Sequence, residues 1–101
     1  MMNDNKIRVL KDMQEGYYEL DLRGTFTYIN DIACSLLEIS RKKVIGVNYT
    51  TFSYTQPTAE LLFRTYNELF KTGIPRKIEY EVVLHSGRKK IIETSISLLR
   101  S

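Results

Sequence analysis

The chain has 101 residues, of which 43% are hydrophobic and 27% are charged. A chain of this length buries roughly 65% of its unfolded surface, which supports one hydrophobic core and one small domain. No apolar run approaches the roughly 20 residues that span a bilayer, and residues 1–5 lack the apolar stretch of a secretory signal. A single cysteine, Cys34, excludes an intramolecular disulfide and a multi-cysteine zinc site. The composition therefore favours a reduced, cytoplasmic setting with no membrane partner.

The positive charge of the chain is small and clustered. Fifteen basic and twelve acidic residues give a net charge of +3, and the basic residues gather at 41–43, 76–77 and 88–90. A nucleic-acid interface would need these clusters on one face, interleaved with aromatic side chains that stack on bases. We favour the simpler interpretation that they are solvated turns and helix ends, and expect no nucleic-acid partner. Salt-dependent retention on heparin or DNA would test the alternative.

Two predicted hairpins flank a helical middle. Residues 17–22 and 25–29 alternate apolar and polar side chains on either side of a short turn containing glycine, which is typical of a hairpin. Residues 78–85 and 92–98 show the same alternation, again around a glycine turn. The sequence therefore predicts four strands in two antiparallel pairs.

The segment after the first hairpin is predicted to be helical and compact. Asn30 or Asp31 is placed to cap a short helix, because a side-chain oxygen there accepts hydrogen bonds from the free N–H groups of the first turn. Residues 48–54 are too rich in β-branched and aromatic residues for a regular helix. We expect an irregular segment there, with Tyr49 and Phe52 turned inward.

The clearest predicted helix lies between Gln56 and Gly73. Gln56 is the expected cap, Pro57 suits the first helical position, and Gly73 is expected to end the helix. Six residues form the expected apolar stripe: Ala59, Leu62, Phe63, Tyr66, Leu69 and Phe70. The order of elements predicts an α+β fold, with helices on one face of an antiparallel sheet.

Residues 15–34 resemble the opening of a PAS sensory domain, in which a hairpin is followed by an asparagine and an alanine-containing helix. Residues 45–48 look like the next landmark of that family, and residues 70–75 resemble the end of its long connecting helix. The sequence Glu79–Glu81 followed by Ser86–Gly87 is similar to its penultimate hairpin. The resemblance covers about residues 15–99 and rests on the order and spacing of these motifs together.

The sequence departs from that family in its number of strands. PAS domains have five strands, with the last in the middle of the sheet, between the first and the fourth. Here the sequence stops at Ser101, directly after the fourth predicted strand. We therefore expect an N-terminal amphipathic helix in residues 1–14 and a PAS domain lacking its final strand in residues 15–101. Each hairpin would then expose an unpaired edge, which implies a fragment or a sheet completed by dimerisation or swapping.

The resemblance argues against the best-known cofactors of the family. Haem-binding members need a histidine in the long helix, and residues 56–72 contain none, while His85 lies at a hairpin end. Photosensory members that bind flavin covalently place a cysteine directly after an asparagine in the helical middle. Here Asn48 is followed by Tyr49, and nothing in the sequence argues for non-covalent flavin. No metal site, nucleophile elbow or acid–base pair is recognisable, so we expect no enzyme activity within this chain.

Seven tyrosines give the sequence its most distinctive feature. Tyr28, Tyr66 and Tyr80 fall on faces predicted to be inward, and Thr94 is an inward polar position on the adjacent strand. Their hydroxyls either satisfy one another or line a small cavity between helices and sheet, where PAS domains hold ligands. The candidate ligand-binding residues are Tyr28, Leu36, Leu37, Phe52, Leu62, Tyr66, Tyr80 and Thr94.

The resemblance implies a sensory or regulatory PAS module of a cytoplasmic signal-transduction protein. Such a module acts by sensing a small ligand or by dimerising and relaying a signal to an output domain of the same parent chain, such as a histidine kinase or a cyclic-dinucleotide enzyme. The alternative is a ligand-free protein–protein interaction domain. We expect a homodimer formed through Ile7, Leu10 and Met13, because this apolar stripe is too short to form a stable helix alone in water.

Overall fold

The computed structural model describes residues 15–52 and 54–99 of the chain, and the expected helix in residues 1–14 lies outside them. Eight elements follow one another in these residues. In chain order they are β1 (Gly16–Leu20), β2 (Phe26–Ile29), α2 (Asp31–Leu37), the short 3₁₀ helices η1 (Arg41–Lys43) and η2 (Tyr49–Thr51), α3 (Gln56–Thr72), β3 (Arg76–Val83) and β4 (Lys89–Leu98). The order of hairpin, helical middle, long helix and hairpin is as predicted.

The four strands form one mixed sheet in the order β2-β1-β4-β3. The pairs β1–β2 and β3–β4 are antiparallel, as expected for hairpins. The two hairpins also pair with each other, because β1 runs parallel to β4 with Gly16 opposite Thr94 and Leu20 opposite Leu98. The expectations of a purely antiparallel sheet and of unpaired inner edges are therefore wrong. In the described residues, the position beside β1 is taken by β4.

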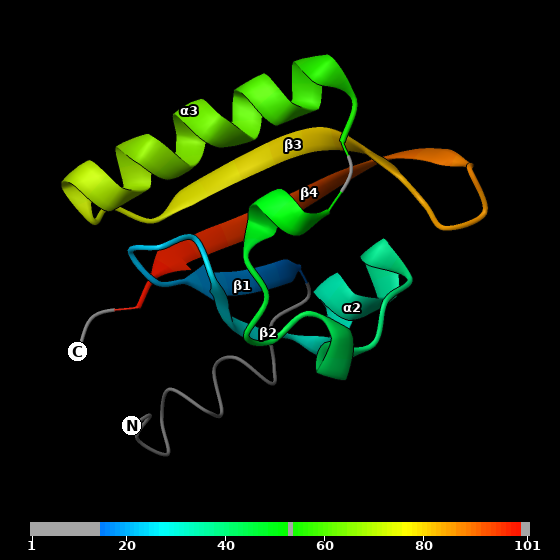
Figure 1. The fold of residues 1–101 in the computed structure, drawn as a ribbon, viewed down its shortest axis with the longest axis horizontal. Coiled ribbons are helices and arrows are strands. Elements are labelled where there is room, and N and C mark those ends of the chain that lie inside the picture. The colour runs from blue at the N-terminus through cyan, green and yellow to red at the C-terminus, as the bar shows by residue number, and fades with distance from the viewer. Residues whose placement is uncertain (1–14, 53, 100–101) are drawn as a thin grey trace.

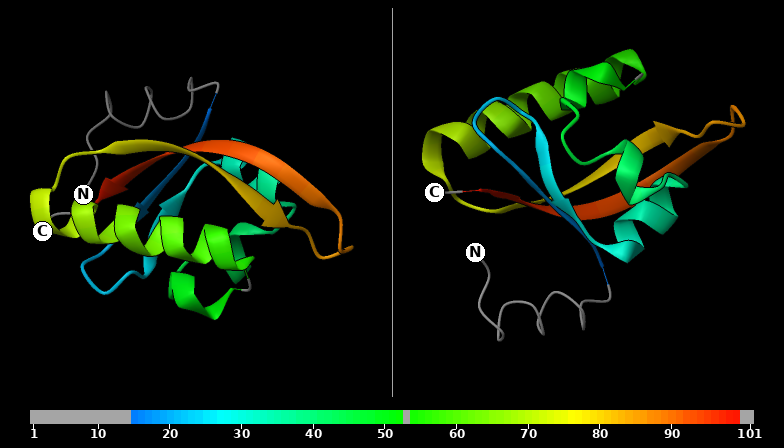
Figure 2. Two further views of the ribbon diagram at one scale, coloured as in Figure 1. Left: turned by 90° about the horizontal axis from the view of Figure 1, so that it is seen from above. Right: turned by 60° about the horizontal axis from the view of Figure 1, so that its bottom comes forward.

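The two α-helices, α2 and α3, cover the same face of this sheet. Figure 1 shows α3 running alongside β3, whereas α2 lies at the other end of the molecule near β1. Tyr18 of β1 contacts Tyr66 of α3 on this face. A Cβ atom at Gly16 would lie 3.1 Å from Leu36 of α2, so α2 packs on the same side of β1. The α+β fold with helices on one sheet face is confirmed, and the hairpin of β3 and β4 extends past the helices in each view (Figure 2).

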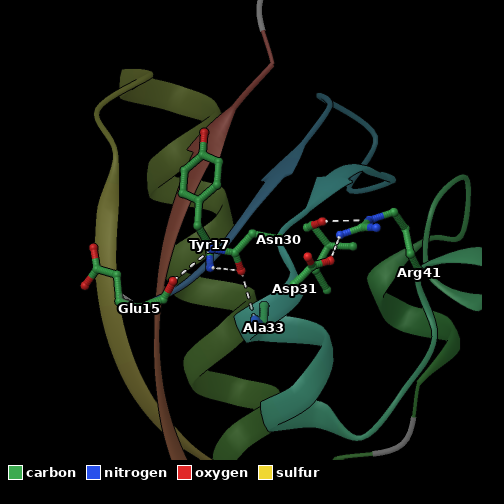
Figure 3. A network of polar contacts seen from close by, with 7 residues as sticks. Glu15, Tyr17, Asn30, Asp31, Ala33 and Arg41 are labelled. Carbon is green, nitrogen blue, oxygen red and sulfur yellow. Dashed lines mark hydrogen bonds and ion pairs between the residues drawn. The ribbon is translucent and has the colours of Figure 1, made fainter. Parts of the chain in front are cut away.

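Asn30 joins the first hairpin to α2 through three backbone contacts (Figure 3). Its Oδ1 atom accepts hydrogen bonds from the backbone N–H of Ala33, at 2.9 Å, and of Tyr17, at 3.0 Å. Its Nδ2 atom donates to the carbonyl oxygen of Glu15 at 2.9 Å. Asn30 is therefore the N-cap of α2, as predicted, and it also fixes this helix to β1.

The helix α3 is confirmed, but its buried stripe differs from the predicted one. The predicted cap, Gln56, is wrong by one position: Thr55 is the N-cap and the helix begins at Gln56. Gly73 ends it, as predicted, with a φ of 70°. The buried residues of α3 are Thr58, Leu62, Tyr66 and Leu69. Phe63 is 59% exposed and Ala59 is exposed as well, so their expected places in the buried stripe are wrong. The polar residue Thr58 is buried because its hydroxyl donates to the carbonyl oxygen of Glu81 at 2.9 Å.

Candidate functional site

A cavity of about 630 Å³ lies between the sheet and the segments that lead from α2 to α3. Its apolar part comes from β1, β2, β3 and the residues around η1. The lining residues are Tyr18, Phe26, Leu37, Glu38, Ile39, Ser40, Lys43, Val44, Phe52, Tyr54, Tyr66, Tyr80, Val82, Val83, Leu84 and His85. This volume is within the range of small-molecule sites in proteins, roughly 300 to 1,000 Å³.

Three buried tyrosine hydroxyls meet inside the protein and form a chain with Thr94. The Tyr18 hydroxyl lies 2.6 Å from that of Tyr66 and 3.2 Å from that of Tyr80. The Thr94 hydroxyl donates to the Tyr80 hydroxyl at 3.4 Å. Tyr18 and Tyr66 are each only 1% exposed, and Thr94 is fully buried. The inward direction predicted for Tyr66, Tyr80 and Thr94 is therefore confirmed.

Burial keeps these phenols in their neutral, proton-bearing form. Desolvation raises the pKa of Tyr18 and Tyr66 well above the ordinary value. Nearby phenols raise both further, although the hydrogen bond with Tyr18 lowers the pKa of Tyr66. Desolvation also raises the pKa of Tyr80, although its hydrogen bonds with Thr94 and Tyr18 act in the opposite direction. At neutral pH each of the three groups is thus a neutral hydroxyl that is able to donate one hydrogen bond and to accept others.

Aromatic side chains hold the tyrosine cluster in place. The Tyr49 ring stands edge-on to the Tyr66 ring, with centroids 4.5 Å apart. The Phe26 ring packs in the same way against Tyr18, and Phe52 packs against Phe26. The expected inward orientation of Tyr49 and Phe52 is confirmed, since both pack against the core. These contacts leave the phenol rings little rotational freedom.

The rim of the cavity carries charged side chains. The carboxylate of Glu38 forms an ion pair with Arg88 at 3.0 Å, which links the end of α2 to the hairpin of β3 and β4. Lys43 and His85 also line the cavity, and both are exposed. The charged groups and the His85 side chain thus lie near solvent, whereas the tyrosine hydroxyls are buried.

The predicted ligand-binding residues are only partly brought together. Four of the eight line the cavity: Leu37, Phe52, Tyr66 and Tyr80. Thr94 does not line the cavity, but its hydroxyl donates to the hydroxyl of Tyr80, which does line it. Leu36 packs against the core beside Gly16, and Leu62 is buried under α3 without lining the cavity.

Tyr28 lies on the opposite face of the sheet, so its predicted inward direction is wrong. It is paired with Glu19 across the hairpin, and its ring contacts that of Tyr17. The register of β1 and β2 changes between Glu19 and Leu20, which shifts the alternation of β2 by one position. Simple alternation through residues 25–29 could not reveal this irregularity.

Several cavity residues were not among the predicted set: Tyr18, Phe26, Val44, Tyr54 and Leu84 line it as well. Tyr18 was detectable, since it occupies the same alternating face as Leu20 in the first strand. Tyr54 was not, because residues 48–54 show no regular period from which a side-chain direction could be read.

The described residues contain no group of three or more His, Cys, Asp or Glu side chains that could hold a metal ion. Burial raises the pKa of the Cys34 thiol, which disfavours the reactive thiolate. Within residues 15–52 and 54–99, no helix is long and apolar enough to cross a membrane.

Each basic cluster includes residues held by acidic neighbours. Arg41 is paired with Asp31, and Arg88 is paired with Glu38. Lys77 lies 2.9 Å from Glu15 and 3.4 Å from Glu93. These pairs lower the positive potential that a nucleic-acid backbone would require, which favours the interpretation of the clusters as solvated surface.

The structure is similar to solved PAS domains. A crystal structure of a PAS domain from a two-component sensor histidine kinase matches with a TM-score of 0.64 and 18% identity, over 96% of this chain and 82% of that one. The PAS domain of an HTR-like protein from Haloarcula marismortui matches with a TM-score of 0.60 and 21% identity, over 89% of this chain and 75% of that one. No family model matches the sequence, and no curated protein sequence matches it either. The chain therefore has a PAS-like fold, and at this level of identity the similarity defines the fold alone.

Proposed function

We propose that this chain is a sensory module of a cytoplasmic signal-transduction protein and that its cavity holds a small ligand. The observation that carries this proposal is the cavity of about 630 Å³, whose largely apolar lining includes Tyr18, Tyr66 and Tyr80, the three tyrosines whose hydroxyls are joined by hydrogen bonds. An apolar pocket with a few convergent polar groups is the usual form of a small-molecule site. The similar PAS domain from a sensor histidine kinase supports a regulatory role rather than catalysis.

A bound ligand would be sensed through the elements that line the cavity. Residues on β1, β3 and α3 all contribute to its wall, and β1 pairs directly with β4. A ligand that contacts the wall can therefore favour one arrangement of the sheet and the helices over another. We propose that this change is relayed by a homodimer to an output domain of the same parent chain, with Ile7, Leu10 and Met13 as the dimer surface.

Native mass spectrometry of the freshly purified chain tests the sensing role. A co-purified small molecule, lost after substitution of the cavity residue Val44 by Trp, supports ligand sensing. A matched control is Ile45→Trp, because Ile45 is exposed while Val44 is 2% exposed and lines the cavity. A ligand-free mass for the wild-type chain, with no small molecule bound after incubation with a metabolite extract, would favour the protein-interaction alternative.

The dimer is tested separately, by sedimentation. Replacing Ile7 and Leu10 by Glu should shift a wild-type dimer towards the monomer, because two charges would have to be buried in the contact. A wild-type monomer, or an unchanged mass after both substitutions, would refute this role of residues 1–14.

A further inference from the structure

The hydroxyl chain contains one more proton than it has hydrogen bonds. Four hydroxyls, those of Thr94, Tyr80, Tyr18 and Tyr66, are joined by three hydrogen bonds. Each hydroxyl supplies one proton and each hydrogen bond uses one. Since Thr94 donates to Tyr80, the remaining proton belongs to a tyrosine, whichever way the two bonds between tyrosines run.

This proton belongs to a side chain that lines the cavity. All three tyrosines line the cavity, and in the described part of the chain none of their hydroxyls donates to a further protein acceptor. By contrast, the hydroxyl of Tyr54, another lining residue, donates to the carbonyl oxygen of Tyr49 at 3.1 Å and is already satisfied. One phenolic O–H of the tyrosines that line the cavity thus has no protein acceptor in the described residues, and an acceptor atom of a ligand can pair with it.

The surroundings of the donor favour a neutral acceptor. The charged lining residues Glu38 and Lys43 are exposed, and so is His85, so all three lie towards solvent rather than at the buried hydroxyls. A buried carboxylate needs a counter-charge or several donors, and one phenol does not provide them. The raised pKa of each tyrosine keeps its proton in place throughout the neutral range.

We propose that the cavity is selective for a small, largely apolar molecule that carries one neutral carbonyl-type oxygen, which accepts the unused phenolic proton. This inference rests on the proposed function of the cavity as a ligand site. In the free protein, solvent in the cavity can accept this proton. A ligand with a carbonyl oxygen replaces that contact, whereas a hydrocarbon of the same shape leaves the buried donor unpaired.

Three aromatic probes of matched shape test the proposal with the intact chain. 2-Acetylnaphthalene carries a carbonyl oxygen, 2-isopropenylnaphthalene replaces that oxygen by a methylene group, and 2-naphthoate carries a charge. Chemical-shift titrations of the labelled protein give each Kd and locate the site. We expect the ketone to bind about threefold to tenfold more tightly than the hydrocarbon. The carboxylate should bind more weakly than the ketone.

Variants distinguish the contribution of the hydroxyl chain to ligand binding from the contribution of the shape of the cavity. Replacing Tyr18, Tyr66 and Tyr80 together by Phe removes the donor and should bring the ratio of the ketone and hydrocarbon Kd values close to one. Two matched controls, Thr94→Val and Tyr54→Phe, each remove a hydroxyl but leave the unused phenolic proton, so the preference for the ketone should persist.

The outcomes distinguish this inference from the proposed function. Binding of all three probes at the cavity, with the hydrocarbon equal to or tighter than the ketone in the wild-type chain, overturns the acceptor requirement and leaves the ligand site standing. A carboxylate that binds more tightly than the ketone overturns the neutral class. No shift of cavity residues with any probe would overturn the ligand site itself. The wild-type ratio is decisive even if the triple variant does not fold.

Discussion

At the scale of single residues, Asn30 connects residues 15–17 at the start of β1 to the first turn of α2. Its side chain is 4% exposed and satisfies two backbone N–H groups and one carbonyl oxygen. Asn30→Ala removes a helix cap and leaves the N–H of Tyr17 buried without its acceptor. We expect a loss of about 2 to 4 kcal/mol in the free energy of unfolding, measured by urea denaturation.

Two related variants define the cause of that loss. Asn30→Asp keeps the oxygen that accepts from both backbone N–H groups and loses only the donor to the carbonyl oxygen of Glu15. It should therefore be less destabilising than Asn30→Ala. Asn48→Ala is the matched control, because Asn48 also caps a short helix, through the N–H of Thr50, but is less buried. It should cost about 0.5 to 1 kcal/mol. Because Asn48 also donates to the carbonyl oxygen of Arg23, equal losses for Asn30 and Asn48 would show that the deeper burial of the Asn30 contacts adds nothing to their effect.

Because of the buried phenols, the free energy of unfolding should fall as the pH rises in the alkaline range. Burial raises the pKa of Tyr80 in the folded state, whereas the unfolded chain ionises near pH 10. A raised folded-state pKa means that the stability from this group is fully present below about pH 10 and is lost above it, because the unfolded state then releases more protons. The slope of unfolding free energy above pH 10 should be less steep in Tyr80→Phe, by about 1.4 kcal/mol per pH unit. Identical slopes would mean that Tyr80 ionises normally in the folded protein.

At the scale of elements, the turn between β1 and β2 supports the tyrosine cluster through Gly24. Its φ is +82°, and an added Cβ would lie 2.8 Å from the Tyr49 ring, which packs on Tyr66. Gly24→Ala should therefore destabilise by about 2 to 4 kcal/mol and disturb the signals of Tyr66 in NMR spectra. Gly46→Ala is the matched control, with a φ of +83° and open space around it. It should cost only about 1 kcal/mol, and an equal cost at both positions would refute the steric role of Tyr49.

The helix α3 shows how far periodicity alone determines burial. Its extent, its glycine end and the burial of Leu62, Tyr66 and Leu69 were predictable, because apolar residues recur at helical spacing. The burial of Thr58 in place of Phe63 could not be predicted, because it depends on the hydrogen-bond acceptor that the carbonyl oxygen of Glu81 provides. A hydropathy pattern treats threonine as polar and carries no information on where it finds a partner.

The neighbouring residues Leu62 and Phe63 make this difference measurable. Leu62 is 1% exposed and Phe63 is 59% exposed. Leu62→Ala should lower the free energy of unfolding by about 2 to 5 kcal/mol, while Phe63→Ala should change it by less than about 0.5 kcal/mol. A larger loss at Phe63 in urea denaturation would indicate that this side chain is buried, as the simple stripe predicts.

At the scale of the whole molecule, the order of the strands is the feature that local sequence patterns leave open. Each hairpin was predictable because its strands are joined by a short turn. The pairing of β1 with β4 joins residues about 78 positions apart, such as Tyr18 and Ile96, and no turn fixes its direction or register. The same long-range pairing brings Tyr18 beside Tyr80 and so completes the hydroxyl cluster. This is why local patterns predicted the inward direction of Tyr66 and Tyr80 but not the contact between Tyr18 and Tyr80.

The register of that pairing can be tested with a disulfide. Glu19 and Ser97 are opposite each other across the parallel strands, on the face away from the helices. In a Cys34→Ala background, cysteines at these two positions should form an intramolecular bridge on oxidation in dilute solution, seen as a loss of two hydrogens by mass spectrometry. Cysteines at Glu19 and Glu93 are the matched control, because they lie four positions out of register and too far apart for a disulfide, roughly 13 Å along the strand. A bridge in the control but not in the test pair would contradict the register, and bridges formed mainly between two molecules would show that the sheet is completed by a second copy.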